Sequence, residues 1–286
     1  MFPRIVFLKH SSAMLIILIA LATGACAALQ PIDANGPRSN EPAYPIGLAD
    51  PAARLEEASV AWYQMSQHYG LTGKTVANLN PYTGTLQDLP QNAGMIVLPK
   101  VGTETVQTEE QTRESLRRFI AEWRPLIGAE PSQLSLVERT DEANGIKLAR
   151  YEQRPFRYPL RGGFGNVVIR FRPDRQVVSI TSNCIPNADR LQPALGGLTP
   201  KINSDEAVEH VRTQPVVAAD AGGRQQTFTI PSSAALAARQ LVVYAQPSAE
   251  QASGLQLYLA WEVEVTNGPM KMVYLDAMSD RVIAVA

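Results

Sequence analysis

Apolar residues recur at spacings of three and four in two segments, which predicts two amphipathic helices that each bury one face. The first helix begins with Asp50 as N-cap and Pro51 at the first helical position. The second opens at Thr108-Glu109-Glu110-Gln111, which has the form of a capping box, and ends near Pro125 and Gly128. The expected buried stripes are Leu55, Ala58, Trp62, Met65 and Tyr69 in the first helix and Leu116, Phe119, Ile120, Trp123 and Ile127 in the second.

After the second helix the apolar period changes to two, which predicts antiparallel strands. We expect strands at 146–151, 167–171, 177–180, 241–244, 255–265, 272–275 and 281–285. Between the third and fourth strands lie a connecting loop over 186–200, rich in Pro and Gly, and a third helix capped by Ser204. A helix followed by strands therefore occurs twice. The pattern predicts an α+β fold of two successive helix-plus-antiparallel-sheet units, preceded by an N-terminal helix and an export signal.

The first 27 residues have the composition of a signal peptide. Arg4 and Lys9 provide a positive start, an apolar run extends from Ala13 to Ala22, and small residues follow. This run is shorter than the ~20 residues that span a bilayer, so a signal peptide is favoured over a transmembrane anchor. Residues 28–50 are rich in Pro and Gly and are predicted to form a flexible tether. We expect an exported protein of the periplasm or cell envelope.

Cys26 stands where the signal would be cleaved, and two interpretations of it stay open. The preceding residues loosely resemble a bacterial lipobox, with Thr23 at the position where Leu is commonest, which indicates lipidation of Cys26 and a membrane anchor through that lipid. Alternatively, cleavage after Ala27 gives a free protein. We favour lipidation because a Cys at this point has no other evident use. Either way Cys184 has no partner for an intramolecular disulfide.

The composition is that of a folded globular protein with no strong charge bias. The chain has 286 residues, of which 45% are hydrophobic and 19% charged, and its formal net charge is −1. Such a balance does not indicate a nucleic-acid partner. The length suggests two domains after removal of the signal.

The sequence offers no coherent set of catalytic, metal-binding or cofactor-binding residues. Its histidines are His10, in the signal, and His68 and His210, which are far apart and form no H-E-x-x-H zinc motif. No G-x-S-x-G nucleophile elbow occurs, and the glycines around Gly163-Phe164-Gly165 precede a strand instead of the helix that a dinucleotide site requires. We therefore expect a protein that is not an enzyme and that uses no cofactor.

From residue 113 onward the sequence resembles the pro-region of thermolysin- and fungalysin-like metallopeptidases, an FTP-like domain followed by a PepSY-like domain. The segments that carry this resemblance are Leu148-Ala149-Arg150-Tyr151-Glu152-Gln153, Tyr158-Pro159-Leu160-Arg161-Gly162-Gly163, 171–180, 202–207, 241–244, 259–265 and Val273-Tyr274-Leu275-Asp276-Ala277. Where the family commonly has Gly in the last turn, this chain has Ser279-Asp280, and Asp tolerates a positive φ. The predicted divisions of the chain are a signal peptide over 1–27, a tether over 28–50, an N-terminal segment over 51–107, an FTP-like domain over 108–200 and a PepSY-like domain over 201–286. The N-terminal segment contains the first helix and an unassigned turn-rich region at 71–105, with a possible strand at 95–98.

Because such pro-regions assist folding of their peptidase and inhibit it, the resemblance implies an inhibitor or folding assistant that acts in trans on a thermolysin-like zinc peptidase. The candidate partner-binding segment is the C-terminal strand Val282, Ile283, Ala284, Val285 and Ala286, which would add to a strand lining the peptidase cleft. The competing interpretation is that this strand only completes its own sheet. A second function also stays open: an envelope lipoprotein that binds a protein or cell-wall partner through an exposed apolar patch, with 71–105 as a candidate region.

Overall fold

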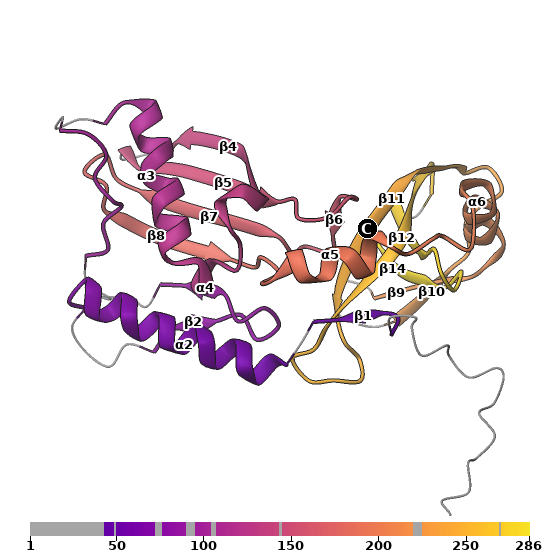
Figure 1. The fold of residues 1–286 in the computed structure, drawn as a ribbon. Coiled ribbons are helices and arrows are strands. Elements are labelled where there is room, and N and C mark those ends of the chain that lie inside the picture. Colours follow the sequence, from indigo (N-terminus) through magenta and orange to yellow (C-terminus); the bar gives the residue numbers. More distant parts are fainter. Residues whose placement is uncertain are drawn as a thin grey trace, which may run out of the picture. The chain divides into compact units, whose positions relative to one another are not determined.

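The computed structural model describes residues 43–48, 50–71, 76–89, 95–103, 107–142, 145–219, 225–268 and 270–286. They lie in one compact unit, Pro42–Ala286. This part of the chain is a mixture of five α-helices and several sheets (Figure 1), which confirms the predicted combination of helices with mainly antiparallel strands. The predicted signal peptide, Cys26, His10 and most of the predicted tether lie outside the described residues.

The two predicted amphipathic helices are confirmed together with their caps. Helix α2, Pro51–His68, begins after Asp50, whose Oδ1 accepts a hydrogen bond from the Ala52 amide at 2.9 Å. Helix α3, Glu109–Glu122, has both halves of the capping box between Thr108 and Gln111. A short helix α4, Arg124–Ile127, follows and ends at Gly128, whose φ of 83° lies in the left-handed region that glycine adopts readily.

The first large sheet packs against α3, as Figure 1 shows. Its strands are β4 (Leu134–Asp141), β5 (Lys147–Gln153), β7 (Asn166–Phe171) and β8 (Val177–Ser182), all antiparallel in the order β4-β5-β7-β8. The three predicted strands are present. Edge strand β4 was not predicted, because its register shifts between Leu136 and Glu138 and the bulge interrupts the alternation of apolar residues.

The turn-rich region 71–105 contributes to the core of this first sheet. It holds β2 (Asn78–Leu79) and β3 (Leu86–Asp88), and the predicted strand at 95–98 is reduced to an isolated bridge between Val97 and Gln176. Leu86, Ile96 and Leu98 are almost fully buried in the same core as Phe119 and Ile169. Among its described residues, the exposed large apolar side chains are Val76 and Met95. Leu86, Ile96 and Leu98 therefore stabilise the fold and are not available to a partner.

The second large sheet has the order β14-β13-β12-β11-β6, and β1 also pairs with β12. Its strands are β1 (Ile46–Gly47), β6 (Leu160–Arg161), β11 (Ala235–Pro247), β12 (Leu255–Thr266), β13 (Met272–Asp276) and β14 (Val282–Val285). Helix α6, Ser204–Thr213, covers one face by packing Ala207 and Val211 against Val263, Val273 and Leu275. A hairpin of β9 (Val216–Ala219) and β10 (Gln225–Phe228) follows α6, and a 3₁₀ turn, Pro131–Gln133, precedes β4. The four predicted strands of this half are confirmed.

Three predictions need correction. The loop predicted over 186–200 contains helix α5, Ala188–Gly196, because burial of Ala188 and Leu195 outweighs the helix-breaking tendency of Pro193. The cap of α6 is Asn203, with Ser204 as the first helical residue.

The third correction concerns the tether predicted over 28–50, whose last residues are packed. Ile46 and Leu48 are buried, and β1 extends the second sheet beside β12. Pairing with Gln256 and Leu257 provides hydrogen-bond partners for backbone N–H and C=O groups of this segment.

Candidate binding cleft

The candidate site is built on an Ω-loop that leaves the first sheet and returns to it. Residues 154–165 connect β5 to β7, and the loop closes where the Gln153 amide donates to the Gly165 carbonyl at 2.7 Å. The buried Gln153 side chain forms two hydrogen bonds with the backbone of Ile185, at 2.8 and 2.9 Å. Asn183 donates to the Gly163 carbonyl and accepts from the Asn166 amide, both at 2.7 Å. These bonds fix the neck of the loop.

The tip of the Ω-loop belongs to the second sheet. Strand β6 pairs in parallel with Val243 and Tyr244 of β11, and the Val243 amide donates to the Pro159 carbonyl at 2.9 Å. Gly162 follows with φ 93°, and a Cβ at this position would lie 1.9 Å from the carbonyl oxygen of Ala245. Only glycine fits there, both for its backbone conformation and for the close approach of the two chains. The Ω-loop is thereby anchored at its neck to the first sheet and at its tip to the second.

An ion pair adds to this anchor. The Arg161 Nε donates to Glu262 Oε1 at 2.7 Å, and the Gln240 Nε2 donates to Glu262 Oε2 at 2.8 Å. Glu262 is 6% exposed, and its burial by itself would raise the pKa of the carboxyl group. The hydrogen bonds from Arg161 and Gln240 outweigh this effect and hold the pKa of Glu262 below its usual range. Glu262 is therefore ionised and holds the loop against the sheet at neutral pH.

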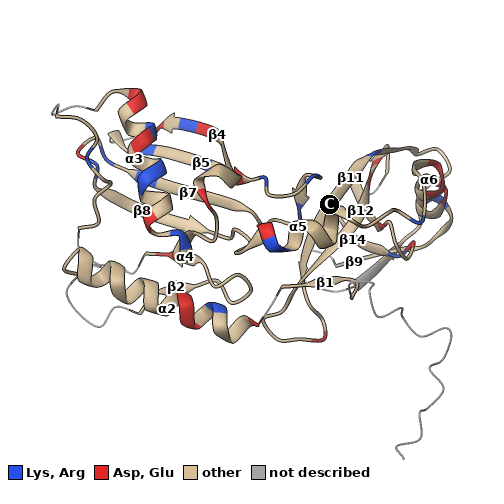
Figure 2. Ribbon diagram, in the orientation of Figure 1, with Lys and Arg blue, Asp and Glu red and all other residues tan. Residues whose placement is uncertain are grey.

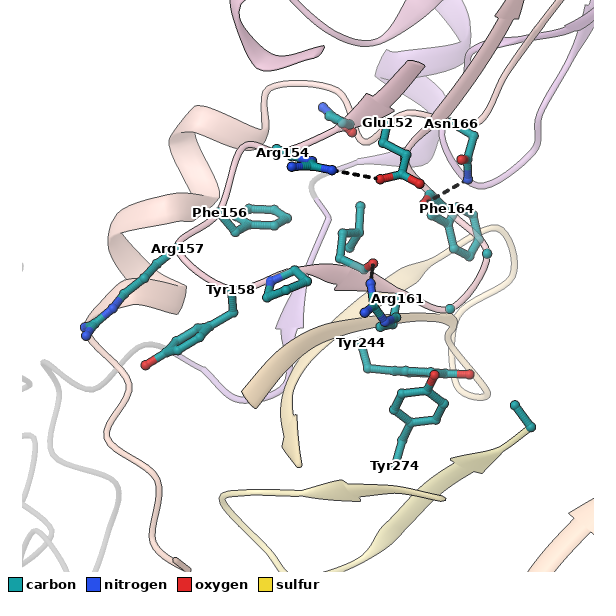
Figure 3. Close-up of a pocket in the computed structure, with 17 residues that line it drawn as sticks. Glu152, Arg154, Phe156, Arg157, Tyr158, Arg161, Phe164, Asn166, Tyr244 and Tyr274 are labelled. Atoms are coloured by element: carbon teal, nitrogen blue, oxygen red, sulfur yellow. Dashed lines mark hydrogen bonds and ion pairs between the residues drawn. The ribbon is translucent and has the colours of Figure 1, made fainter. Parts of the chain in front are cut away.

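Between the Ω-loop and the outer face of the second sheet lies a cleft of about 790 Å³ (Figure 3). This volume is within the range of roughly 300–1,000 Å³ that is typical of ligand sites. Loop residues form most of its wall, and Tyr244, Tyr274 and Ala286 complete it from the sheet. The aromatic side chains that line the cleft are Phe156, Tyr158, Phe164, Tyr244 and Tyr274.

Tyr244 and Tyr274 form a tilted pair with ring centroids 4.5 Å apart. Figure 3 shows both rings on the same side of Arg161, where they form one wall of the cleft. Burial raises the pKa of both phenols, so neither is ionised at neutral pH. This part of the cleft offers flat apolar surface with hydroxyl groups as hydrogen-bond partners.

The charged residues of the loop are mainly positive, as Figure 2 shows. Arg154 Nη2 lies 3.4 Å from a Glu152 carboxylate oxygen, and both side chains are at least half exposed. The Arg157 guanidinium lies over the Tyr158 ring, 5.4 Å from its centroid. By contrast, both positive and negative residues occur along α3 and β4.

The other residues considered from sequence do not form a site. His68 lies 3.9 Å from Glu122, and His210 lies 3.8 Å from Asp280 at a separate place in the fold. Within the described ranges, no group of three or more His, Cys, Asp or Glu side chains could hold a metal ion. Burial raises the pKa of the Cys184 thiol to about 12.

The C-terminal strand is part of the second sheet. β14 pairs with β13. The partly buried Val282 and Val285 pack against the core beneath α6, and Ile283 and Ala284 pack on the opposite face near Tyr274. The Ala286 amide donates to the Met272 carbonyl at 2.9 Å. These contacts favour the interpretation that the strand completes its own sheet. None of its residues except Ala286 lines the cleft.

The Asp276-Ala277 pair, which carries much of the family resemblance, has a structural role. Asp276 is 2% exposed and accepts hydrogen bonds from the Ser279 hydroxyl at 2.6 Å and from the Tyr44 hydroxyl at 2.5 Å. The Ala277 amide donates to the Leu259 carbonyl at 2.8 Å. Asp280 has φ 56°, which agrees with the positive φ expected for this turn.

Compared with known proteins, the chain matches no family model and no curated protein. No helix among the described residues is long and apolar enough to cross a membrane. The cleft itself was not predicted as a site. The available signal was the spacing of Phe156, Tyr158 and Phe164 among arginines and glycines, which is also compatible with an ordinary hairpin loop.

Proposed function

We propose that this protein is a non-catalytic, exported binding protein of the metallopeptidase pro-region kind, which acts in trans on a partner polypeptide. The observation that carries the proposal is the cleft, which has a rigid frame, aromatic walls and arginines at its edge. Aromatic residues and arginine are the side chains that contribute most often to the binding energy of protein interfaces. A segment of the partner occupies the cleft in this proposal.

The arrangement of elements supports the resemblance on which the partner class rests. Helix α3 precedes the sheet β4-β5-β7-β8, and helix α6 precedes the strands β11 to β14. This order is compatible with an FTP-like unit over 108–200 and a PepSY-like unit over 201–286. The proposed partner is therefore a thermolysin-like zinc peptidase, and the proposed action is inhibition of that enzyme or assistance with its folding.

The proposed location is the periplasm or cell envelope, with a lipid anchor at Cys26. This part of the proposal rests on the sequence of the first 27 residues alone. Mass spectrometry of the protein from its producing cell tests it: a diacylglycerol-modified N-terminal Cys26 supports the anchor, and an unmodified N-terminus at Ala28 supports free export.

The decisive experiment titrates the purified protein into a thermolysin-type peptidase and follows hydrolysis of a peptide substrate. A parallel assay measures the yield of active peptidase when it refolds with and without the protein. The proposal is supported if the wild type gives saturable inhibition or a raised refolding yield. The effect should be smaller with the Tyr244→Ala variant and unchanged with the Tyr63→Ala variant. Tyr63 is a suitable control because it is 65% exposed on α2, outside the cleft. If the protein neither inhibits any such peptidase nor raises its refolding yield, a role in proteolysis is refuted.

A second candidate is an envelope module that binds a protein or cell-wall partner unrelated to proteolysis. The packing of β14 favours it, since β14 pairs with β13 and the partly buried Val282 and Val285 pack against the core of their own sheet. Deletion of Val285 and Ala286 tests whether any peptidase inhibition comes from the C-terminal strand or from the cleft. Because Ala286 also lines the cleft, the deletion variant is compared with Tyr244→Ala. Loss of peptidase inhibition in a folded deletion variant but not in Tyr244→Ala would assign inhibition to the C-terminal strand, and unchanged inhibition in the deletion variant would assign it to the cleft. If the intact protein inhibits no peptidase, the second candidate is preferred.

A further inference from the structure

We propose that the cleft selects a carboxylate-bearing segment of the partner polypeptide, with Arg154 and Arg157 binding its acidic side chains and the aromatic walls holding an adjacent apolar side chain. This inference rests on the proposed function, which assigns a polypeptide to the cleft, and adds the chemistry of the segment that is bound.

The charge of the Ω-loop is the first argument. Residues 152–166 contain three arginines, no lysine and one carboxylate, Glu152. Arg161 is neutralised by the buried Glu262. Among the residues that the structure describes, Arg154 is matched only by the exposed Glu152, and such exposed pairs contribute about 0–1 kcal/mol. Among the described residues, Arg157 has no carboxylate partner, and its described side-chain contact is with the Tyr158 ring. Two guanidinium groups are therefore available to a ligand.

Side-chain chemistry identifies what these arginines accept. A guanidinium presents a planar set of N–H donors that matches a carboxylate with two parallel hydrogen bonds. Phe156 and Tyr158 alternate with Arg154 and Arg157 along the loop, and Figure 3 shows Phe156 between Arg154 and Tyr158 on the cleft wall. An acidic side chain next to an aromatic or aliphatic one would satisfy both kinds of group.

The sheet provides a reason to favour a polypeptide over a glycan. Strand β6 is the last strand of the second sheet and is two residues long, so its extended backbone ends within the cleft wall. An extended peptide can pair with the edge of such a sheet through main-chain hydrogen bonds while its alternate side chains enter pockets. A sugar chain lacks this regular series of donors and acceptors.

The test uses the full-length protein and fluorescent peptides, with affinity measured by polarisation. One peptide alternates Glu with Phe and Ile, a second replaces each Glu by Gln, and a third replaces each Glu by Lys. The key variant is Arg154→Gln/Arg157→Gln. Its matched control is Arg117→Gln/Arg118→Gln, which removes the same charge from exposed positions on α3. Circular dichroism and thermal unfolding establish that both variants are folded.

We expect the acidic peptide to bind most tightly and to lose about tenfold or more in affinity with the Arg154/Arg157 variant, as a charge-assisted hydrogen bond to a ligand carboxylate predicts. The control variant should bind like the wild type, and added salt should weaken the wild type more than the Arg154/Arg157 variant. Equal affinity for the Glu and Gln peptides, or no effect of the Arg154/Arg157 substitutions, would overturn the inference.

The two levels of proposal fail differently. If all three peptides bind equally and Tyr244→Ala abolishes that binding, the cleft still holds polypeptides but does not select acidic ones. If no peptide binds, the selectivity proposed here is wrong, and the peptidase titration still decides the proposed function independently.

Discussion

Arg161 and Glu262 form an ion pair at 2.7 Å that joins the Ω-loop of the first sheet to the outer face of the second. The two residues are 101 positions apart in the sequence. Glu262 is buried, whereas the Arg161 side chain is 37% exposed. The pair therefore determines where the wall of the cleft lies as well as stabilising the fold.

Replacing Arg161 by Met should destabilise the protein by about 1–3 kcal/mol, because it leaves a buried carboxylate without its cation, an effect reduced by the partial exposure of Arg161. Urea unfolding measures the change. The double substitution Arg161→Met/Glu262→Gln should recover part of the loss. If the double variant lost as much as the two single losses added together, the pair would not be coupled.

The same carboxylate predicts a pH dependence. Because the pKa of Glu262 is lower in the folded state, its stabilisation is complete above the unfolded-state pKa of about 4.3 and is lost as the pH falls through the lower folded-state pKa. The free energy of unfolding of Glu262→Gln should therefore fall less steeply than that of the wild type below about pH 4.3. Chemical denaturation from pH 6 to pH 3 compares the two slopes. Parallel slopes would contradict the prediction.

Gly162 and Gly163 form a matched pair for testing the loop anchor. Both have positive φ, but a Cβ at Gly162 meets the backbone of Ala245, whereas a Cβ at Gly163 meets no atom within 4 Å. Gly163→Ala should lower the free energy of unfolding by about 1–2 kcal/mol, because alanine is strained in this backbone conformation. Gly162→Ala should cost more and displace β6 from β11, which amide hydrogen exchange at Val243 detects. Equal costs for both variants would show that close packing at Gly162 is not required.

The Tyr44 hydroxyl ties the segment before α2 to the second sheet, and its contribution can be measured. Its hydroxyl donates to the buried Asp276 and accepts from the Leu259 amide at 3.2 Å. Tyr44→Phe should lower the free energy of unfolding by about 1–3 kcal/mol, because polar groups near the end of β13 lose a partner. Tyr63→Phe, at an exposed position on α2, should change it by less than about 0.5 kcal/mol. Indistinguishable stabilities would indicate that the hydrogen bonds of the Tyr44 hydroxyl do not contribute to the stability of the fold.

Cys184 should be unreactive in the folded protein. The side chain is buried, and the raised pKa of its thiol leaves almost no thiolate at neutral pH. A thiol reagent at pH 8 should modify Cys184 rapidly in denaturant and more than about 100-fold more slowly without it, since reaction requires opening of the core. Rapid labelling of the native protein, located by peptide mapping, would contradict the burial of this residue.

Local sequence was sufficient to predict much of the secondary structure. The caps at Asp50 and Thr108 and the stripes of α2 and α3 are local signals, and each is present in the structure. The alternation in β5 and β7 likewise follows from one buried face. Where packing compensates for an unfavourable local sequence, as at Pro193 in α5 and at Ile46 in β1, prediction from sequence was wrong.

The sequence by itself determined the mixed helix-and-sheet character of this protein, because hydrophobic period and capping act over a few residues. Only the tertiary structure determined the cleft, because it depends on pairs distant in the sequence. Leu160 meets Val243, Arg161 meets Glu262, and Gly162 meets Ala245. No local pattern encodes which strand edge the Ω-loop joins. That choice depends on burying Glu262 with its cation and on satisfying the backbone of β11, and both require the two sheets to be already in place.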